Sequence, residues 1–255
     1  AFLEGCGLEG RVALVTGAGR GLGLAAAPGL AQAGAEVYLV SRTANELERA
    51  AESIRSSGGV AAPLACDVAN GAQVRDAIAR IPRLDILVNN AGGNIPEPFI
   101  DVTEEHLDRI LDLNVRAAFL VAQAAARKML EAPDRKVRGG AMVNISSQMG
   151  HVGAAGRTVY CMTKHALEGL TKALAVELAP HNIRVNSVAP TFIDTPMTAP
   201  FFEEPRFRDW VLSRIPLGRL GKLEEVVAAV VFLASPDASL ITGASLVVDG
   251  GWTAQ

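Results

Sequence analysis

Short apolar runs alternate with longer helix-like stretches from one end of the chain to the other. Parallel strands need a crossover between them that is usually a helix, so this alternation favours a parallel sheet with helices on both faces. The run Ile86–Val88 is apolar throughout, as expected of a strand that is buried on both faces. We therefore predict an α/β fold with one doubly wound parallel sheet of seven strands. The expected strands are Val12–Thr16, Val37–Val40, Ala61–Ala65, Ile86–Asn89, Ala141–Ile145, Arg184–Val188 and Leu246–Val248.

Helical stretches separate these strands. Pro28 lies inside the first of them, where a proline removes a backbone hydrogen bond. We expect residues 1–255 to form a single domain, because no repeat or change of composition divides the 255 residues. The expected helices are Gly21–Ala33, Asn45–Ser57, Ala72–Ile81, Thr103–Ala132, Thr158–Leu178, Glu203–Arg214 and Leu223–Ala234.

Two segments are expected to be irregular. Pro133–Gly140 is charged and ends on glycine, which predicts a solvated loop. Pro190–Pro205 is longer, and apolar side chains in a long loop favour a lid over a binding site, here around residues 190–215. The apolar residues of this segment are Phe192, Met197, Phe201 and Phe202.

Composition and charge exclude several classes of function. Apolar residues make up 49% of the chain and charged residues 20%, which is typical of a folded globular protein. The net charge of −3 and the lack of a basic run argue against a nucleic-acid partner. The longest apolar run, Val226–Ala234, is too short to span a bilayer. Widely spaced cysteines, histidines without ligand spacing and no visible signal peptide predict a cytoplasmic protein without disulfides or a metal site.

A glycine-rich turn, Thr16-Gly17-Ala18-Gly19-Arg20-Gly21-Leu22-Gly23, follows the first expected strand directly. Glycine lets the backbone approach a pyrophosphate closely, and the helix that follows offers free N–H groups and a partial positive charge. Glycines alone are weak evidence, because tight turns use them for other reasons. The position between a strand and a helix is the context that a dinucleotide site requires, so the turn predicts a Rossmann-type sheet.

The spacing Thr-Gly-x-x-x-Gly-x-Gly resembles the glycine-rich turn of the short-chain dehydrogenase/reductase family. Asn89-Asn90-Ala91-Gly92 and Cys66-Asp67-Val68 stand in the family's register at two other strand ends, and the resemblance runs from about Gly10 to Gly251. It implies a nicotinamide cofactor whose adenine is contacted by Asp67. The residues that it places on the cofactor here are Gly17, Arg20, Gly21, Leu22, Gly23, Asp67, Val68, Asn90, Ala91 and Gly92.

The end of the second strand distinguishes NAD from NADP. An acidic residue there binds the 2′-hydroxyl of the ribose and repels a 2′-phosphate, whereas an arginine pairs with that phosphate. Ser41 stands at the acidic position, Arg42 follows it, and Arg20 in the glycine turn could reach the same phosphate. We therefore favour NADP(H) over NAD(H). The alternative is that Arg42 is a surface charge and Arg20 only part of the helix start.

Tyr160 and Lys164 are four residues apart in an expected helix, so they lie on one face of it. A lysine ammonium favours the phenolate of a nearby tyrosine, whose ordinary pKa of about 10 makes it a poor base at neutral pH. The family resemblance implies that Tyr160 moves a proton and that Ser147 hydrogen-bonds the substrate oxygen. It also implies that Lys164 binds the nicotinamide ribose and that Asn114 holds a water linked to Lys164. Ser146 is the alternative to Ser147, which we prefer for its spacing from Tyr160.

The segment from Ala189 to Thr195 resembles the part of the family that lies against the nicotinamide. This adds Pro190, Ile193 and Thr195 to the expected cofactor contacts, together with Tyr160 and Lys164. Thr191 stands where the family usually has glycine. The residues expected to touch substrate are Gln148, His151 and Phe192.

Together these features predict an oxidoreductase that transfers hydride between the cofactor and the alcohol or ketone group of a small substrate. The resemblance implies a homotetramer. Two other classes fit part of the pattern. One is a nucleotide-binding regulator on the same fold that has lost catalysis, against which the intact quartet argues. The other is an adenosylmethionine-dependent methyltransferase, which usually has an acidic residue where Ser41 stands and gives no role to Tyr160 and Lys164.

Overall fold

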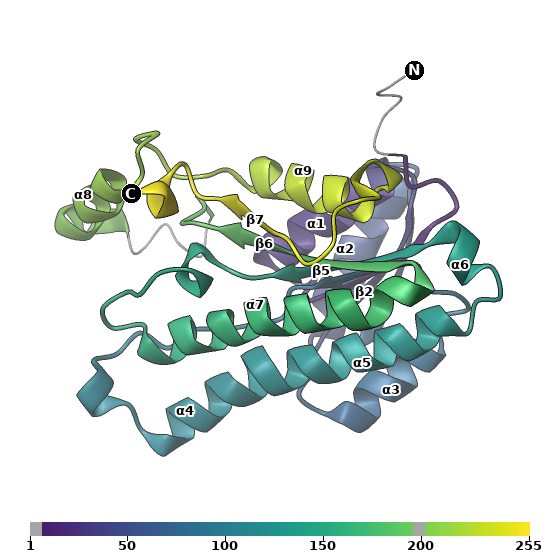
Figure 1. Cartoon of the computed structure of the whole chain (residues 1–255), viewed down its shortest axis with the longest axis horizontal. Coiled ribbons are helices and arrows are strands. Elements are labelled where there is room, and N and C mark those ends of the chain that lie inside the picture. The colour runs from purple at the N-terminus through teal and green to yellow at the C-terminus, as the bar shows by residue number, and fades with distance from the viewer. Residues whose placement is uncertain (1–6, 196–201) are drawn as a thin grey trace.

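The structure is a computed structural model of the chain, and it describes residues 7–195 and 202–255. Its centre is a parallel sheet of seven strands in the order β3-β2-β1-β4-β5-β6-β7 (Figure 1). The predicted α/β fold with a doubly wound sheet is therefore confirmed. The strands are β1 (Val12–Thr16), β2 (Glu36–Ser41), β3 (Val60–Ala65), β4 (Ile86–Asn89), β5 (Gly140–Ile145), β6 (Ile183–Pro190) and β7 (Ser245–Val248).

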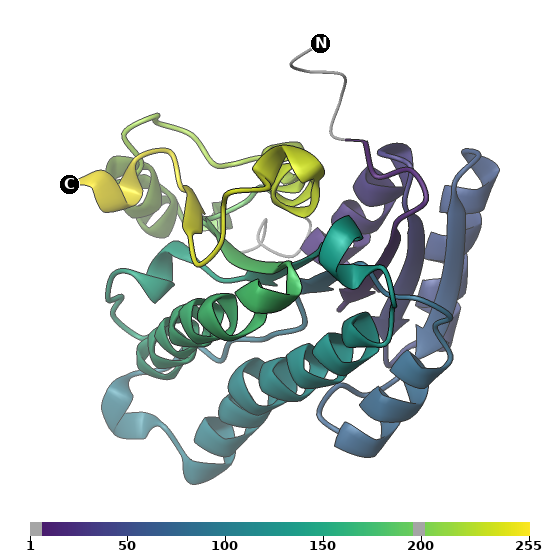
Figure 2. The ribbon, with the colours of Figure 1, turned by 45° about the vertical axis from the view of Figure 1, so that its right-hand side comes forward.

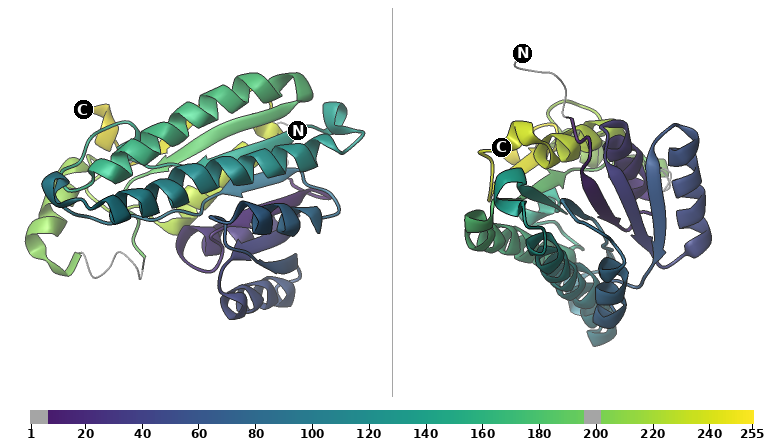
Figure 3. Two further views of the ribbon diagram at one scale, coloured as in Figure 1. Left: turned by 90° about the horizontal axis from the view of Figure 1, so that it is seen from below. Right: turned by 90° about the vertical axis from the view of Figure 1, so that its right-hand side faces the viewer.

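Helices cover both faces of the sheet, as Figure 2 shows. One face carries α1 (Gly21–Gln32), α2 (Ala44–Ser56) and α9 (Leu223–Ala234), and the other carries α3 (Gly71–Ala79), α5 (Ala117–Leu130) and α7 (Thr158–Leu178). In Figure 3, α4 (Glu104–Leu111) and α5 form one long rod that runs along α7. The remaining helices are α6 (Arg135–Arg138) and α8 (Pro205–Arg214).

Successive residues of each strand face opposite layers, because side chains alternate along a strand. Val15 and Leu39 are fully buried against the α1, α2 and α9 layer. Leu14 and Val40 are buried against the layer of α3, α5 and α7. The order of the strands places β1 beside β4, where the chain reverses its direction of winding. Ligands of such sheets bind at the carboxyl ends of the strands next to this point.

One predicted helix is interrupted. The pattern over Thr103–Ala132 predicts a continuous helix, but a single π turn at Asp112–Arg116 separates α4 from α5. A π turn holds more residues than an α turn and often occurs at functional sites. Hydrophobic periodicity does not reveal such a local change, because the apolar stripe continues on either side of it.

The prediction of a solvated loop over Pro133–Gly140 is wrong. The segment contains the short helix α6 and the first residue of β5, and the side chain of Arg135 is buried in it. Arg135 donates hydrogen bonds to the carbonyl oxygen of Leu84 at 2.6 Å and to Oδ1 of Asp85 at 3.0 Å. The carboxylate of Asp85 is fully buried, and it holds the Arg135 side chain inside the protein. The charged sequence of the segment had predicted that this arginine is solvated.

The expected irregular stretch from Pro190 to Pro205 is only partly described. Pro190 is the last residue of β6, and Pro205 is the first of α8. Met197 and Phe201 lie outside the described residues. In the part of the chain that the structure describes, no helix is both long and apolar enough to cross a membrane.

Candidate active site

The glycine-rich turn after β1 is built so closely that side chains would not fit in it. Gly17 has a φ of +67°, and a Cβ there would lie 2.8 Å from Nδ2 of Asn90. A Cβ on Gly23 would lie 2.4 Å from the carbonyl oxygen of Gly17. Among the described residues, the N-cap side chain of α1 makes no capping hydrogen bond, so the first N–H groups of the helix can bind an anion. The turn therefore fits the pyrophosphate of a dinucleotide cofactor.

Thr16 ties this turn to the end of β4. Its Oγ1 accepts hydrogen bonds from the backbone N–H groups of Asn90 and Ala91, both at 3.0 Å. In return, Nδ2 of Asn90 donates to the carbonyl oxygen of Thr16 at 2.9 Å. Sequence analysis took Thr16 only as the first letter of the motif and missed this role. A hydroxyl in a fully buried position at a strand end was the available signal.

The predicted ribose-binding residues lie beside the same turn. A Cβ on Gly19 would lie 3.0 Å from Oγ of Ser41, so the last residue of β2 closely approaches the turn. Arg20 and Arg42 are both exposed. Glu46, which sequence analysis did not single out, brings Oε2 to 2.7 Å from the same Cβ position. An acid on the first turn of α2 therefore lies near this end of the site, in addition to the expected arginines.

At the predicted adenine contact, Asp67 shapes its own turn. Its Oδ1 accepts from the backbone N–H of Ala69 at 3.0 Å, and its backbone N–H donates to Oε1 of Gln73 at 2.9 Å. The following residue, Val68, is buried. These contacts fix the loop after β3 at the same edge of the sheet as the glycine-rich turn.

Asn114 lies in the π turn and binds the loop after β4 on both sides. Its Oδ1 accepts from the backbone N–H of Gly93 at 2.8 Å, and its Nδ2 donates to the carbonyl oxygen of Gly93 at 2.8 Å. Nδ2 also donates to Oγ1 of Thr163 on α7 at 3.1 Å. A Cβ on Gly92 would be 3.3 Å from Oδ1 of Asn114 and 3.8 Å from Nζ of Lys164. Asn114 and Lys164 therefore flank the same glycine.

Tyr160 and Lys164 lie on the first turns of α7, as predicted. The Nζ of Lys164 is 5.5 Å from the centre of the Tyr160 ring and donates to the carbonyl oxygen of Ile145 at 2.8 Å. Burial lowers the pKa of Lys164 from 10.5 to about 8, and the charge of Glu168 opposes this shift. The ammonium is therefore held in a dry position at the end of β5.

Two opposing effects set the pKa of Tyr160. Burial raises it above 10.0 and is the largest cause, and the charge of Cys161 adds to this effect. A hydrogen bond with Ser147 lowers the pKa, as does the positive charge of Arg157. Arg157 is the residue directly before α7, and its effect on Tyr160 was not predicted from the sequence. Within the described part of the chain, its buried Nη1 has no hydrogen-bond partner.

The two adjacent serines face different neighbours. Ser147 donates to Oε1 of Gln148 at 3.1 Å, accepts from the backbone N–H of Met149 at 3.1 Å and acts on Tyr160. The buried Oγ of Ser146 would be 2.8 Å from a Cβ on Gly150. Of the two hydroxyls, the one on Ser147 is thus placed toward the tyrosine.

The residues expected to touch substrate are distributed unevenly. Gln148 is buried, and its Nε2 has no hydrogen-bond partner among the described residues. Nε2 of His151 instead lies 2.9 Å from Oγ of Ser245 and 3.5 Å from Oε1 of Glu168, so its ring contacts β7 and α7. Phe192 belongs to an aromatic cluster, with its ring centre 5.8 to 5.9 Å from those of three neighbours. These neighbours are Phe202, Phe207 and Trp252.

The segment expected along the nicotinamide continues from β6. Pro190 ends the strand, and the backbone N–H of Thr191 donates to the carbonyl oxygen of Val248 at 3.1 Å. Ile193 is buried and forms a parallel bridge with Gly221. Thr191, where a glycine was expected, thus occupies regular backbone next to β7.

Comparison with known proteins identifies the family. The family model described as enoyl-(acyl carrier protein) reductase, a short-chain dehydrogenase/reductase model, matches residues 17–253. This chain belongs to the short-chain dehydrogenase/reductase family. L-Xylulose reductase from Mus musculus is 42% identical over 250 residues, which cover 97% of this chain and 98% of that protein. Gluconate 5-dehydrogenase from Gluconobacter oxydans (strain 621H) is 40% identical over 251 residues, with 96% of each chain covered.

The fold matches a solved structure of a relative equally well. Gluconate 5-dehydrogenase from Burkholderia cenocepacia J2315, in complex with NADP and tartrate, superposes with a TM-score of 0.93 at 36% identity and 98% coverage of both chains. Because dehydrogenases and reductases of this family match almost the whole chain, it is an NAD(P)-dependent oxidoreductase acting on alcohol or carbonyl groups. The alternative of an inactive regulator is not favoured.

We predict that Thr16→Val destabilises the protein by about 2 kcal/mol, because it leaves two partly buried backbone N–H groups without their acceptor. Thr16→Ser is the matched control, since it keeps the hydroxyl and loses only a methyl group, at about 1 kcal/mol. Urea unfolding at constant m-value measures both variants. Equal unfolding midpoints for the valine and serine variants would show that the Thr16 hydroxyl does not hold the two strand ends together.

Proposed function

We propose that this enzyme interconverts a ketone and an alcohol on a small polyhydroxylated substrate, with Tyr160 as proton donor and acceptor and NADP(H) as the preferred cofactor. The protonation state of Tyr160 is the main support for the proposed proton transfer. Because burial raises its pKa, the phenol holds its proton at neutral pH and has one to give. Ser147 beside it and Lys164 one turn further along α7 supply the other groups that such a transfer needs.

In the reducing direction, the hydroxyl of Ser147 rotates its single proton from Oε1 of Gln148 to the substrate carbonyl oxygen. A bound nicotinamide would supply a hydride to the carbon, which would leave negative charge on that oxygen. Tyr160 then donates its proton to the oxygen, and the charge of Arg157 stabilises the phenolate that remains. In the oxidising direction the phenolate removes the hydroxyl proton.

Lys164 and Asn114 act around Tyr160. The three protons of the Lys164 ammonium allow it to bind the nicotinamide ribose while one of them stays on the carbonyl oxygen of Ile145. Asn114 holds Gly93 through both ends of its amide, which fixes the loop after β4 against α7. Its Oδ1 has a second lone pair on the side of Gly92 and Lys164, where it can hold a water that carries the tyrosine proton to solvent.

Two features support a polyhydroxylated substrate. Two of its relatives are named for sugar and sugar-acid substrates, L-xylulose and gluconate. The buried Nε2 of Gln148, next to Ser147, lacks a partner in the described structure, and such a group is costly unless it finds a hydrogen-bond acceptor such as a substrate hydroxyl. We assign Gln148 to the substrate hydroxyls. Phe192 and His151 border the pocket, His151 in its contacts with Ser245 and Glu168.

We place the enzyme in the cytoplasm as a homotetramer, and exposed apolar residues on the long helices support the assembly of copies. Phe119 on α5 and Met162 and Val176 on α7 are all exposed, with 47%, 47% and 79% of their surfaces accessible. Apolar side chains on two parallel helices of one face are typical of contacts between copies of a chain.

A panel of ketoses, polyols, simple ketones and sugar acids tests the function by cofactor absorbance. We expect turnover of at least one polyhydroxylated ketone or alcohol, and Tyr160→Phe should abolish it while leaving cofactor binding unchanged. Tyr38→Phe is the matched control, because Tyr38 is the other tyrosine of the chain and lies on β2. Turnover close to that of the unmodified enzyme in Tyr160→Phe would refute the role of this residue.

For the cofactor, we expect a lower KM for NADPH than for NADH. Arg42→Ala should raise the KM for NADPH by about tenfold or more, because it removes a charge-assisted contact with the 2′-phosphate, and should leave the KM for NADH unchanged. The control is Arg49→Ala, which removes an exposed arginine from α2 whose Nε bonds the carbonyl oxygen of Asn45. A lower KM for NADH than for NADPH in the unmodified enzyme would contradict the preference.

The pH dependence should differ between the two directions. Reduction needs the protonated phenol and should stay constant through neutral pH, whereas oxidation needs the phenolate and should rise with pH. Since the charge of Arg157 lowers the pKa of Tyr160, Arg157→Met should move the rising limb of oxidation to higher pH, and Arg157→Lys should restore it. Profiles of kcat/KM check this. A limb that stays in place in Arg157→Met would exclude an electrostatic role for Arg157.

A further inference from the structure

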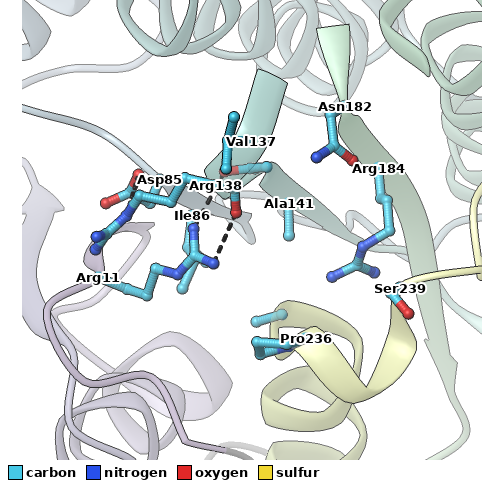
Figure 4. Close-up of a pocket in the computed structure, with 13 residues that line it drawn as sticks. Arg11, Asp85, Ile86, Val137, Arg138, Ala141, Asn182, Arg184, Pro236 and Ser239 are labelled. Carbon is cyan, nitrogen blue, oxygen red and sulfur yellow. Dashed lines mark hydrogen bonds and ion pairs between the residues drawn. The ribbon is translucent and has the colours of Figure 1, made fainter. Parts of the chain in front are cut away.

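A cavity of about 290 Å³ lies at the edge of the sheet opposite the candidate active site. Its walls come from the amino ends of β4, β5 and β6, the end of α6, and the segment that follows α9. Arg11, which precedes β1, and Arg184 of β6 stand on opposite sides of it in Figure 4, and Arg138 lies above them. Arg11 and Arg184 therefore face one another across the cavity, whereas the guanidinium of Arg138 is turned toward Asp85 and donates to the carbonyl oxygen of Gly10.

The carboxylate at this cavity is already paired with arginines. Asp85 is the one carboxylate among the described residues that line the cavity. Its Oδ1 lies 3.0 Å from Nε of Arg83, 3.0 Å from Nη2 of Arg135 and 3.7 Å from Nε of Arg138. The buried Nε of Arg138 has no hydrogen-bond partner in the described structure. Asp85 thus contacts three arginines, of which Arg83 also pairs with Asp134 at 2.9 Å, and Arg184 has no carboxylate partner among the described residues.

Arg11 and Arg184 contact only carbonyl oxygens in the described part of the chain. The guanidinium of Arg11 donates to the backbone carbonyl oxygens of Arg138 at 2.8 Å and of Gly139 at 3.2 Å. Arg184 donates to Leu233 at 2.8 Å, with further bonds to the carbonyl oxygens of Ser235 and Ile241. A guanidinium has five N–H donors, so both groups keep donors that these carbonyls do not take.

The two guanidiniums also repel each other. Burial lowers the pKa of Arg184, and the charge of Arg11 lowers it further. Burial likewise lowers the pKa of Arg11, followed by the charge of Arg138. The charge of Asp85 acts on Arg11 in the opposite direction, but that carboxylate is already paired with Arg83 and Arg135. An anion between Arg11 and Arg184 would neutralise the repulsion and take up the remaining donors.

We propose that this cavity binds a small polyanion, a compound with two or more carboxylate groups or a phosphate, through Arg11 and Arg184. Water takes about 30 Å³ per molecule in the liquid, so the cavity has room for a compound the size of about ten waters. Such a ligand would join the start of β1, the start of β6 and the region after α9. Because it binds only the folded chain, it would raise the temperature of unfolding, and the rise would grow with the logarithm of its concentration once that exceeds the Kd.

Calorimetric titration and thermal unfolding with citrate and with inorganic phosphate test this site. NaCl at matched ionic strength serves as the baseline. We expect saturable binding of citrate, phosphate or both, with a rise in Tm beyond that given by NaCl. The two arms show whether carboxylates or phosphate are preferred. If neither anion binds, or if neither raises Tm above the NaCl baseline, the proposal is overturned.

Variants locate the binding. Arg184→Gln and Arg11→Gln should each weaken binding of the anion by about tenfold or more, because each removes charge-assisted hydrogen bonds. They lie on different elements, so one remains informative if the other does not fold. The matched control is Arg42→Gln, at the predicted ribose end of the active site. Affinity lost in Arg42→Gln but kept in Arg184→Gln and Arg11→Gln would place the anion in the cofactor site and overturn the proposal.

Discussion

The hydroxyl of Thr16 accepts hydrogen bonds from two successive N–H groups at the end of β4, and the layout of the site depends on this contact. Since β1 and β4 are neighbours at the point where the sheet changes its direction of winding, their ends must separate there. Thr16 fixes where they do. It holds Asn90 against Gly17, so the glycine-rich turn and the loop after β4 form one surface.

A second set of buried polar contacts ties this surface to α7. Nδ2 of Asn89 donates to the carbonyl oxygen of Ala118 and to Oδ1 of Asn144, and Nδ2 of Asn144 donates to Oγ1 of Thr171. Buried polar groups that satisfy one another in a chain fix their neighbours more firmly than apolar packing does. Lys164 lies in the same layer, where burial removes water from its ammonium group. This loss of hydration lowers the pKa of Lys164 to about 8. The polar contacts therefore make the site rigid, although the burial of the charged Lys164 within it is unfavourable.

The sequence was sufficient for the sheet, because each strand carries its own apolar run and each crossover its own helical pattern. It was also sufficient to bring Ser147, Tyr160 and Lys164 together, since strand ends and helical spacing place them independently of packing. It could not reveal Arg157 or Glu46. Their importance depends on where a side chain points after the loops have packed, and a surface charge in a loop looks the same whether it is solvated or turned inward.

The same distinction explains the errors. Pro133–Gly140 was taken as solvated because it is rich in charge, yet Arg135 is buried by a carboxylate from a distant segment, Asp85. Pairing across 50 residues leaves no local pattern. The four arginines around this carboxylate were likewise invisible as a group, since Arg11, Arg83, Arg135 and Arg138 come from three separate parts of the chain.

The π turn at Asp112–Arg116 has a consequence for which changes in chain length the enzyme can accept. Each residue of an α-helix turns the chain by about 100°. Deleting one residue between Thr103 and Asn114 would let the turn relax into a regular helix and swing the asparagine away from Gly93. Adding one would rotate it the other way. This stretch therefore tolerates substitution far better than insertion or deletion, unlike the surface loops that connect the other elements.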